Sequence, residues 1–115
     1  MFNQPYCDNY SMKQLQIIVR PSKVNDVMDS LRKADVGGLT LCGVRGMGRA
    51  EPPLVGDTYS MEQISVTVDD DKVSEVFDTV SKVGCTGQKG DGKVFVTDVV
   101  DALDLCTKKT GSDAI

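Results

Sequence analysis

The sequence predicts one α+β domain in which two helices cover one face of a four-stranded antiparallel sheet. The first observation is an internal duplication: residues 23–33 match residues 72–82 without a gap. The second is that segments rich in β-forming residues flank both copies. The third is the length of 115 residues, which suffices for one hydrophobic core but is small for a self-sufficient enzyme.

Each copy of the duplication predicts one amphipathic helix. Apolar residues recur at i, i+3, i+4 and i+7, a spacing that places them on one helical face. These positions are Val24, Val27, Met28 and Leu31 in the first copy and Val73, Val76, Phe77 and Val80 in the second. We expect Pro21-Ser22 and residues 69–71 to supply the residues that cap the two helices.

The flanking segments predict the strands of the sheet. Residues 15–20 and 39–44 flank the first helix, and residues 64–68 and 94–96 flank the second. The resulting order βαββαβ is that of the ferredoxin-like sandwich. We expect the sheet face without helices to be apolar and covered by another subunit, aided by a tail strand over residues 99–105.

The two ends and the middle of the chain complete the expected organisation. Residues 1–11 lack a basic start and an apolar stretch, so they predict a short flexible arm rather than a signal peptide. Residues 12–115 are expected to form the domain. Between its halves, residues 46–60 contain Pro52-Pro53 and several glycines, which predict a functional loop without regular structure. Arg45 and Arg49 at its base are candidate anion ligands.

Composition excludes several function classes. The formal net charge of −4 argues against nucleic-acid binding, and no apolar run is long enough for a membrane span. The cysteines are widely spaced and predict a reducing, cytoplasmic setting, with Cys42 and Cys85 in the core and Cys7 and Cys106 near the ends. The sequence has no histidine, which removes Ser-His and Cys-His catalysis and most zinc sites.

The most informative segment is Thr-Gly-Gln-Lys-Gly-Asp-Gly-Lys, residues 86–93. Its glycines can adopt positive φ and direct backbone N–H groups at one point, while its lysines add positive charge. Asp91 is expected either to fix the loop or to accept a hydrogen bond from a sugar hydroxyl. This pattern favours an anion cradle for a phosphate, formed by Gly87, Gly90, Gly92, Lys89 and Lys93. The alternative is a tight β-turn with solvated lysines.

This segment is not predicted to be the phosphate-binding P-loop of a nucleoside triphosphatase. The spacing Gly87-x4-Gly92-Lys93 imitates that motif, but Val94 stands where a magnesium-binding Ser or Thr is needed. A strand pattern also follows the segment, where a helix would be expected. Because no paired carboxylates or activated nucleophile accompany the segment, with Asp91 and Glu51 as weak candidates, we expect no enzyme, and a slow nucleotide hydrolase is the least favoured class.

Over residues 12–115 the chain resembles the PII signalling family. The resemblance is carried by Lys13–Pro21 with Lys23, by Gly38-Leu-Thr-Leu41, by Val44-Arg-Gly-Met-Gly-Arg49, and nearly residue for residue by Thr86–Val96. It implies a homotrimer that binds adenine nucleotides in the clefts between subunits. It also implies that residues 46–60 correspond to the T-loop, which moves against partner proteins.

By position, the resemblance implies roles for individual residues. The adenine pocket would be lined by Gly38, Thr40 and Thr67. Phosphates would be contacted by Gly46, Met47, Gly48 and Arg49. The loop residues Gly87, Gly90, Asp91, Gly92 and Lys93 would hold phosphate and ribose. A small anion would bind at Arg45, Gly46, Gly48 and Arg49, and no metal site is implied.

The chain also departs from the family pattern. The T-loop is shorter than in typical members, and Tyr59 does not align with the modified tyrosine. Ala50 and Met61 replace a glutamine and a lysine that serve magnesium and 2-oxoglutarate. Asp104 and Cys106 replace two arginines that reach the outer phosphates, although Lys108 or Lys109 could substitute.

These departures favour a divergent PII-like sensor of the carbon-assimilation branch, linked to bicarbonate transport or carboxysomes. We expect ADP or AMP to bind at least as tightly as ATP, with bicarbonate as co-effector. The partner would be a transporter or enzyme of carbon or nitrogen assimilation. Two alternatives stay open: a metal-responsive trimer resembling the CutA group, and a conventional nitrogen regulator that responds to 2-oxoglutarate.

Overall fold

The computed structural model describes residues 10–46 and 59–115, with the side chain of Tyr59 left out. The remaining parts of the predicted arm and T-loop, residues 1–9 and 47–58, lie outside the described residues. The elements follow the predicted βαββαβ order, with short 3₁₀ turns added. They are β1 (Met12–Val19), η1 (Pro21–Lys23), α1 (Val24–Lys33), β2 (Leu39–Gly46), β3 (Tyr59–Asp69), η2 (Asp70–Lys72), α2 (Val73–Gly84), β4 (Gly92–Val99) and η3 (Gly111–Ala114).

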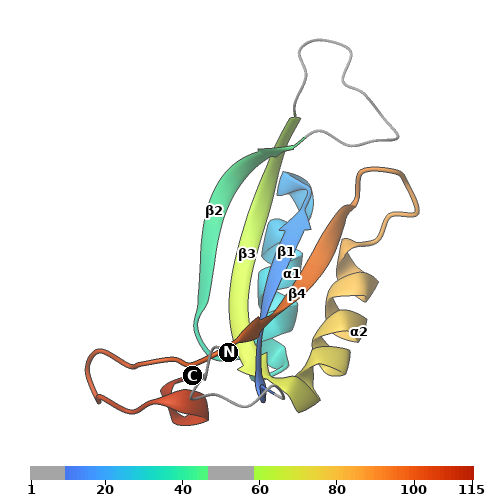
Figure 1. Ribbon diagram of the computed structural model, residues 1–115. Helices are drawn as coiled ribbons and strands as arrows, with labels where there is room; N and C mark the ends of the chain where they lie inside the picture. The colour runs from blue at the N-terminus through green and yellow to red at the C-terminus, as the bar shows by residue number, and fades with distance from the viewer. Residues whose placement is uncertain (1–9, 47–58) are drawn as a thin grey trace, which may run out of the picture.

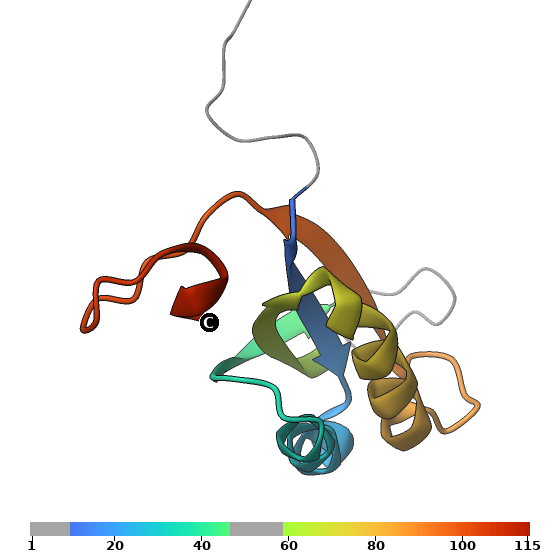
Figure 2. The ribbon, with the colours of Figure 1, turned by 90° about the horizontal axis from the view of Figure 1, so that it is seen from below.

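The four strands form one antiparallel sheet in the order β2-β3-β1-β4 (Figure 1). Both helices pack on the same side of it, as Figure 2 shows from below, and the C-terminal segment lies on the other side. The ferredoxin-like fold is thereby confirmed. No helix in residues 10–46 and 59–115 is long and apolar enough to cross a membrane.

The core lies between the helices and the sheet. Alternate residues of each central strand point toward the helices, because successive side chains of a strand face opposite sides. The apolar helix positions Val27, Leu31, Val76 and Val80 meet them, as the duplication predicted. Phe77 is an exception, because it is 42% exposed and lies outside the core. The strand residues of the core are Leu15, Ile17, Val19, Ile64, Val66 and Val68. Fully burying each large aliphatic side chain contributes about 1.5–3 kcal/mol.

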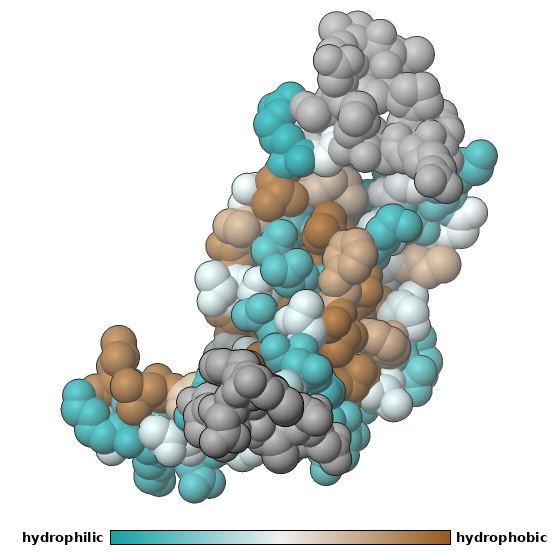
Figure 3. Space-filling view, in the orientation of Figure 1, coloured by the Kyte–Doolittle hydropathy of each residue, from teal (hydrophilic) through white to brown (hydrophobic). Residues whose placement is uncertain are grey.

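The opposite face of the sheet is only in part the apolar surface we expected. The same alternation that buries Leu15, Ile17 and Val19 turns the intervening residues outward. In register on that face lie Gln14, Gln16 and Ile18 of β1, Ser65, Thr67 and Gln63 of β3, and Thr97 and Phe95 of β4. The space-filling view accordingly mixes hydrophilic and hydrophobic side chains (Figure 3). The register also places two apolar pairs on this face, Met12 with Val99 and Val44 with Met61, so the face is mixed. We call it the polar face because its central residues are Gln14, Gln16, Ser65 and Thr67.

Three local expectations are also wrong. No side chain caps α1 or α2, because each helix continues from a 3₁₀ turn whose first carbonyl already accepts the N–H of Val24 or Val73. Cys42 and Cys85 are exposed in this single chain rather than buried. Cys42 lies on the polar sheet face opposite Gln63, and Cys85 follows the end of α2.

The tail does not form the predicted strand over residues 99–105. Only Val99 continues β4, and the chain then makes a narrow hairpin closed by an isolated bridge between Leu103 and Thr110. Asp104 sets the turn of this hairpin, because its carboxylate accepts the N–H groups of Cys106 and Thr107 at 2.8 and 3.0 Å. These bonds lower the pKa of Asp104.

Candidate functional site

The glycine-rich segment forms a compact loop between α2 and β4. Gly87, Gly90 and Gly92 have positive φ of 82°, 87° and 131°, which confirms the backbone conformation expected for these glycines. Gly92 has a second constraint, since an added Cβ would overlap the carbonyl oxygen of Ile18 in β1. A side chain at this position would push β4 away from its neighbouring strand.

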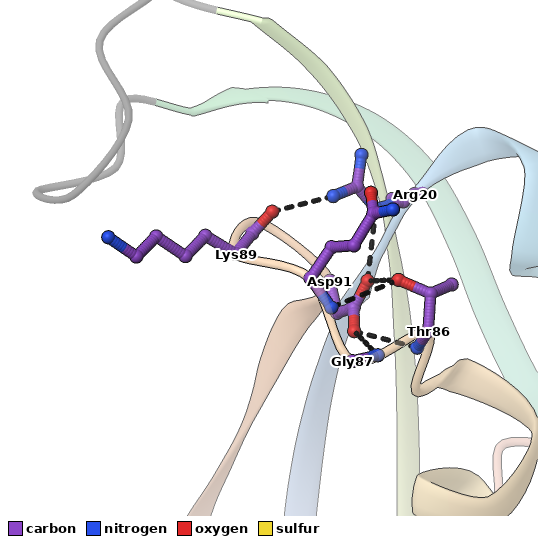
Figure 4. A network of polar contacts seen from close by, with 6 residues as sticks. Arg20, Thr86, Gly87, Lys89 and Asp91 are labelled. Atoms are coloured by element: carbon purple, nitrogen blue, oxygen red, sulfur yellow. Dashed lines mark hydrogen bonds and ion pairs between the residues drawn. The ribbon is translucent and has the colours of Figure 1, made fainter.

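Asp91 holds the loop closed from the inside (Figure 4). Its Oδ2 atom accepts the backbone N–H groups of Thr86 at 2.7 Å and Gly87 at 3.1 Å. Its Oδ1 atom accepts the Thr86 hydroxyl and the Nε–H of Arg20, the latter at 3.2 Å. The Thr86 hydroxyl is the main reason that the pKa of Asp91 falls to about 2. Of the two roles predicted for Asp91, the contacts are those of the loop-fixing role.

Arg20, which contacts the loop from the end of β1, is the residue of this site that sequence reasoning missed. It follows β1, and its guanidinium reaches the loop twice, at Asp91 and at the carbonyl oxygen of Lys89, which accepts from Nη2 at 2.6 Å. The pairing of β1 with β4 is the feature that could have revealed this contact. Val19 at the end of β1 is opposite Gly92 at the start of β4, so the next residue of β1 must adjoin the loop.

These contacts reduce the number of loop groups that are available to bind an anion. The N–H of Gly87 is already donated to Asp91, so a phosphate cannot use it without breaking that bond. The charge of Asp91 is matched by Arg20, which leaves the exposed lysines Lys89 and Lys93 as the loop's positive charges. An anion would therefore meet the segment from Lys89 to Lys93 rather than the whole loop.

The residues assigned by resemblance to the adenine pocket line one cavity. Gly38, Thr40 and Thr67 surround a space of ≈ 250 Å³ on the polar face of the sheet. Its other lining residues are Gln14, Gly37, Ser65, Val66, Ala114 and Ile115. None of these side chains is charged, so the cavity suits an uncharged polar group.

The cavity and the glycine loop lie at opposite ends of the sheet. Gln14 in the cavity is five residues before Val19, which pairs with Gly92 at the loop. At about 3.4 Å per residue, this separation is about 17 Å along the strand. Thr40 and Ser65 are level with Gln16, about 10 Å from Val19 in the same direction. The two groups of predicted ligand residues are therefore separated within one chain.

The T-loop residues are only partly placed. Arg45 and Gly46 end β2, at the same end of the sheet as the glycine loop (Figure 1). Met47, Gly48 and Arg49 lie outside the described residues, as does Ala50. Met61 is 7% exposed within β3, so no cationic side chain stands at that position.

A second cavity was not predicted. It has a volume of ≈ 460 Å³, lies beside the glycine loop between α2 and β4, and is lined mostly by apolar residues such as Phe77, Val80 and Val94. Cys85 and Lys93 are also among its lining residues. Among residues 10–46 and 59–115, no group of three or more acidic or cysteine side chains could hold a metal ion.

Comparison with known proteins identifies the family. The model of the family "Nitrogen regulatory protein P-II" matches residues 12–109. The chain belongs to this family, and the expectation of a regulatory protein rather than an enzyme is thereby confirmed.

Curated relatives and solved structures agree. The chain is 30% identical to the nitrogen regulatory protein P-II of Mesorhizobium japonicum over 90% of this chain and 100% of that one. It is 35% identical to that of Porphyra purpurea over the same shares. Arabidopsis thaliana PII bound to citrate superposes with a TM-score of 0.81 at 29% identity, covering 96% and 97% of the two chains. The B. subtilis GlnK–ATP complex superposes with a TM-score of 0.80 at 28% identity, covering 91% of this chain and 98% of that one.

Proposed function

We propose that this PII protein is a homotrimeric sensor that binds an adenine nucleotide between subunits. The observation that carries the proposal is the separation of about 10–17 Å along the strands between the cavity, whose side chains are uncharged, and the cationic loop. The base requires a neutral polar pocket, and the phosphates require the lysines and glycines of the loop. We infer that one nucleotide uses the cavity of one subunit and the loop of a neighbouring subunit. The complex of B. subtilis GlnK with ATP supports this ligand class.

We further propose that ADP or AMP binds at least as tightly as ATP. Asp104 adds a negative charge in the tail, and its carboxylate is fixed in the hairpin turn. Each additional phosphate adds negative charge to the ligand, and no arginine at position 104 or 106 is present to bind it. Lys108 belongs to the same turn and donates to the carbonyl oxygen of Leu105 at 2.8 Å, so it is partly committed there.

The proposed co-effector is a small anion at the base of the T-loop, and bicarbonate is our candidate. Met61 is buried and uncharged, so it provides no counter-charge for a dicarboxylate such as 2-oxoglutarate. Arg45 and Gly46, with Gly48 and Arg49 beyond the described residues, would suit a compact monoanion. Arabidopsis PII was solved bound to citrate, so a relative binds an organic anion, one with three carboxyl groups. We infer that the T-loop then engages a cytoplasmic partner in carbon or nitrogen assimilation.

Calorimetry tests the proposal directly. The protein should bind ADP and AMP, with ATP no tighter, and millimolar bicarbonate at constant pH and ionic strength should raise ADP affinity. If only 2-oxoglutarate raises ADP affinity, the protein is a conventional nitrogen-type sensor. If no adenine nucleotide binds while zinc or copper does, the metal-responsive alternative replaces the proposal.

A further inference from the structure

The C-terminal segment returns to the cavity on the polar sheet face. After β4 the chain leaves the sheet and reverses through its hairpin, and Gly111 brings it back with a φ of 65° (Figure 2). The N–H of Gly111 donates to the carbonyl oxygen of Ala102 at 3.0 Å and to the Asp101 carboxylate at 3.1 Å. These bonds close the base of the hairpin and direct residues 111–115 toward the sheet.

A side-chain bond fixes the returning segment to the sheet itself. The hydroxyl of Ser112 donates to Oδ1 of Asp69, the last residue of β3, at 2.9 Å. Beyond this anchor, Ala114 and Ile115 line the cavity. Ile115 also faces Gly37, where an added Cβ would lie 3.7 Å from the Ile115 carbonyl carbon. We call residues 111–115 the C-terminal strap.

We propose that the C-terminal strap is one wall of the nucleobase subsite and contributes to the choice of base. This inference rests on the proposed function, and it adds residues that neither the sequence nor the resemblance assigned. The floor of the cavity is the sheet, with Gln14, Ser65 and Thr67 in neighbouring positions of β1 and β3. Ala114 and Ile115 border this floor together with Gly37 and Gly38.

The chemistry of the lining explains why the wall matters. Hydroxyl and amide side chains can each donate or accept a hydrogen bond, so Gln14, Ser65 and Thr67 alone discriminate weakly between bases. A fixed steric boundary adds discrimination, because a base with a different outline then loses hydrogen bonds or clashes. Ala114 and the glycines Gly37 and Gly38 present little more than backbone, which lets a flat ring approach closely.

Two substitutions test the strap. Ser112→Ala removes its anchor at an exposed position, and Ala114→Leu narrows the cavity. Ser30→Ala is the matched control, because the Ser30 hydroxyl donates only to the carbonyl oxygen of Val27 within α1. The measurements are affinities for ADP, GDP and inorganic pyrophosphate, together with sedimentation to check the oligomeric state.

We expect Ala114→Leu to weaken ADP binding about tenfold or more and Ser112→Ala about fivefold, which matches the loss of one hydrogen bond. The ADP-to-GDP affinity ratio should fall in Ser112→Ala, while pyrophosphate binding and the Ser30→Ala control stay unchanged. Unchanged ADP affinity in both strap variants would overturn the inference while leaving nucleotide sensing intact. Equal losses for ADP and pyrophosphate would also overturn it. If the unmodified protein binds no adenine nucleotide, the proposed function fails and the strap inference fails with it.

Discussion

The Nε atom of Arg20 lies 3.2 Å from Oδ1 of Asp91 and joins the end of β1 to the glycine loop across 71 positions of sequence. The same guanidinium donates to the carbonyl oxygen of Lys89. Together with the Thr86 and Gly87 bonds to Asp91, this pair gives the loop one shape before any ligand arrives. A preformed loop costs less ordering entropy when an anion binds.

Replacing Asp91 tests whether this shape matters for ligands. In Asp91→Asn, one oxygen becomes an NH₂ group that cannot accept the N–H groups of Thr86 and Gly87. We expect ADP affinity to fall about tenfold, because the loop must then be ordered on binding. Asp29→Asn is the control, since Asp29 also accepts a hydrogen bond from an arginine but lies on the exposed face of α1, away from the loop. Wild-type ADP affinity in Asp91→Asn would mean that the loop needs no internal support.

The pKa of Asp91 gives a pH prediction. The pKa is lowered from 3.8 to about 2, so the loop bonds are fully present above pH 3.8 and are lost as the pH falls through about 2. The amide resonances of Thr86 and Gly87 should therefore titrate in NMR spectra with a midpoint near the lower value. A midpoint at the ordinary value for an aspartate would show that these N–H groups do not bind the carboxylate in solution.

Arg20 should not tolerate replacement by lysine. An ammonium group carries the same charge, but it cannot present two N–H groups in the fixed geometry that reaches both Asp91 and the carbonyl of Lys89. We expect Arg20→Lys to weaken ADP binding severalfold, and Arg32→Lys on α1 to leave it unchanged. Hydrogen exchange at residues 86–91 should accelerate in the first variant alone. Equal behaviour of the two variants would show that Arg20 acts only as a surface charge.

Gly92 is the loop glycine whose replacement should most affect stability. Alanine there would combine an unfavourable φ of 131° with overlap of the Ile18 carbonyl oxygen. We expect Gly92→Ala to lower the free energy of unfolding by about 1–3 kcal/mol or more. Gly38→Ala is the comparison, because an added Cβ at Gly38 meets nothing within 4 Å. Thermal unfolding without ligand measures both, and equal melting temperatures would contradict the strand geometry at Gly92.

The helices could be predicted from sequence because their apolar periodicity is local. The strands were predicted too short at β3, since Tyr59–Gln63 pairs with β2 through backbone bonds that do not depend on side-chain pattern. The Arg20–Asp91 pair was missed because it joins distant residues through the sheet register. The strap was missed because its course depends on the hairpin bonds of Asp101 and Asp104, where the sequence alone favoured a strand.

The polar sheet face had a visible signal that was misread. Gln14, Gln16 and Ser65 alternate with buried aliphatic residues, which is the usual pattern for a sheet with one polar face. The residues assigned by resemblance to the adenine pocket came together as one cavity, whereas Met47, Gly48 and Arg49 lie outside the described residues. Their part in binding stays a prediction.

If one nucleotide bridges the cavity of one subunit and the loop of another, mixing two defective variants should restore binding. Thr40→Leu should fill the cavity, and Lys93→Glu should repel phosphate at the loop, so neither variant alone should bind ADP well. In trimers reassembled from an equal mixture, about one site in four combines an intact cavity with an intact loop from different subunits. We expect ADP binding with near wild-type affinity to reappear at that fraction of sites. Absence of recovered binding in verified mixed trimers would contradict the bridged arrangement, because the cavity and loop would then have to act within one chain or not together at all.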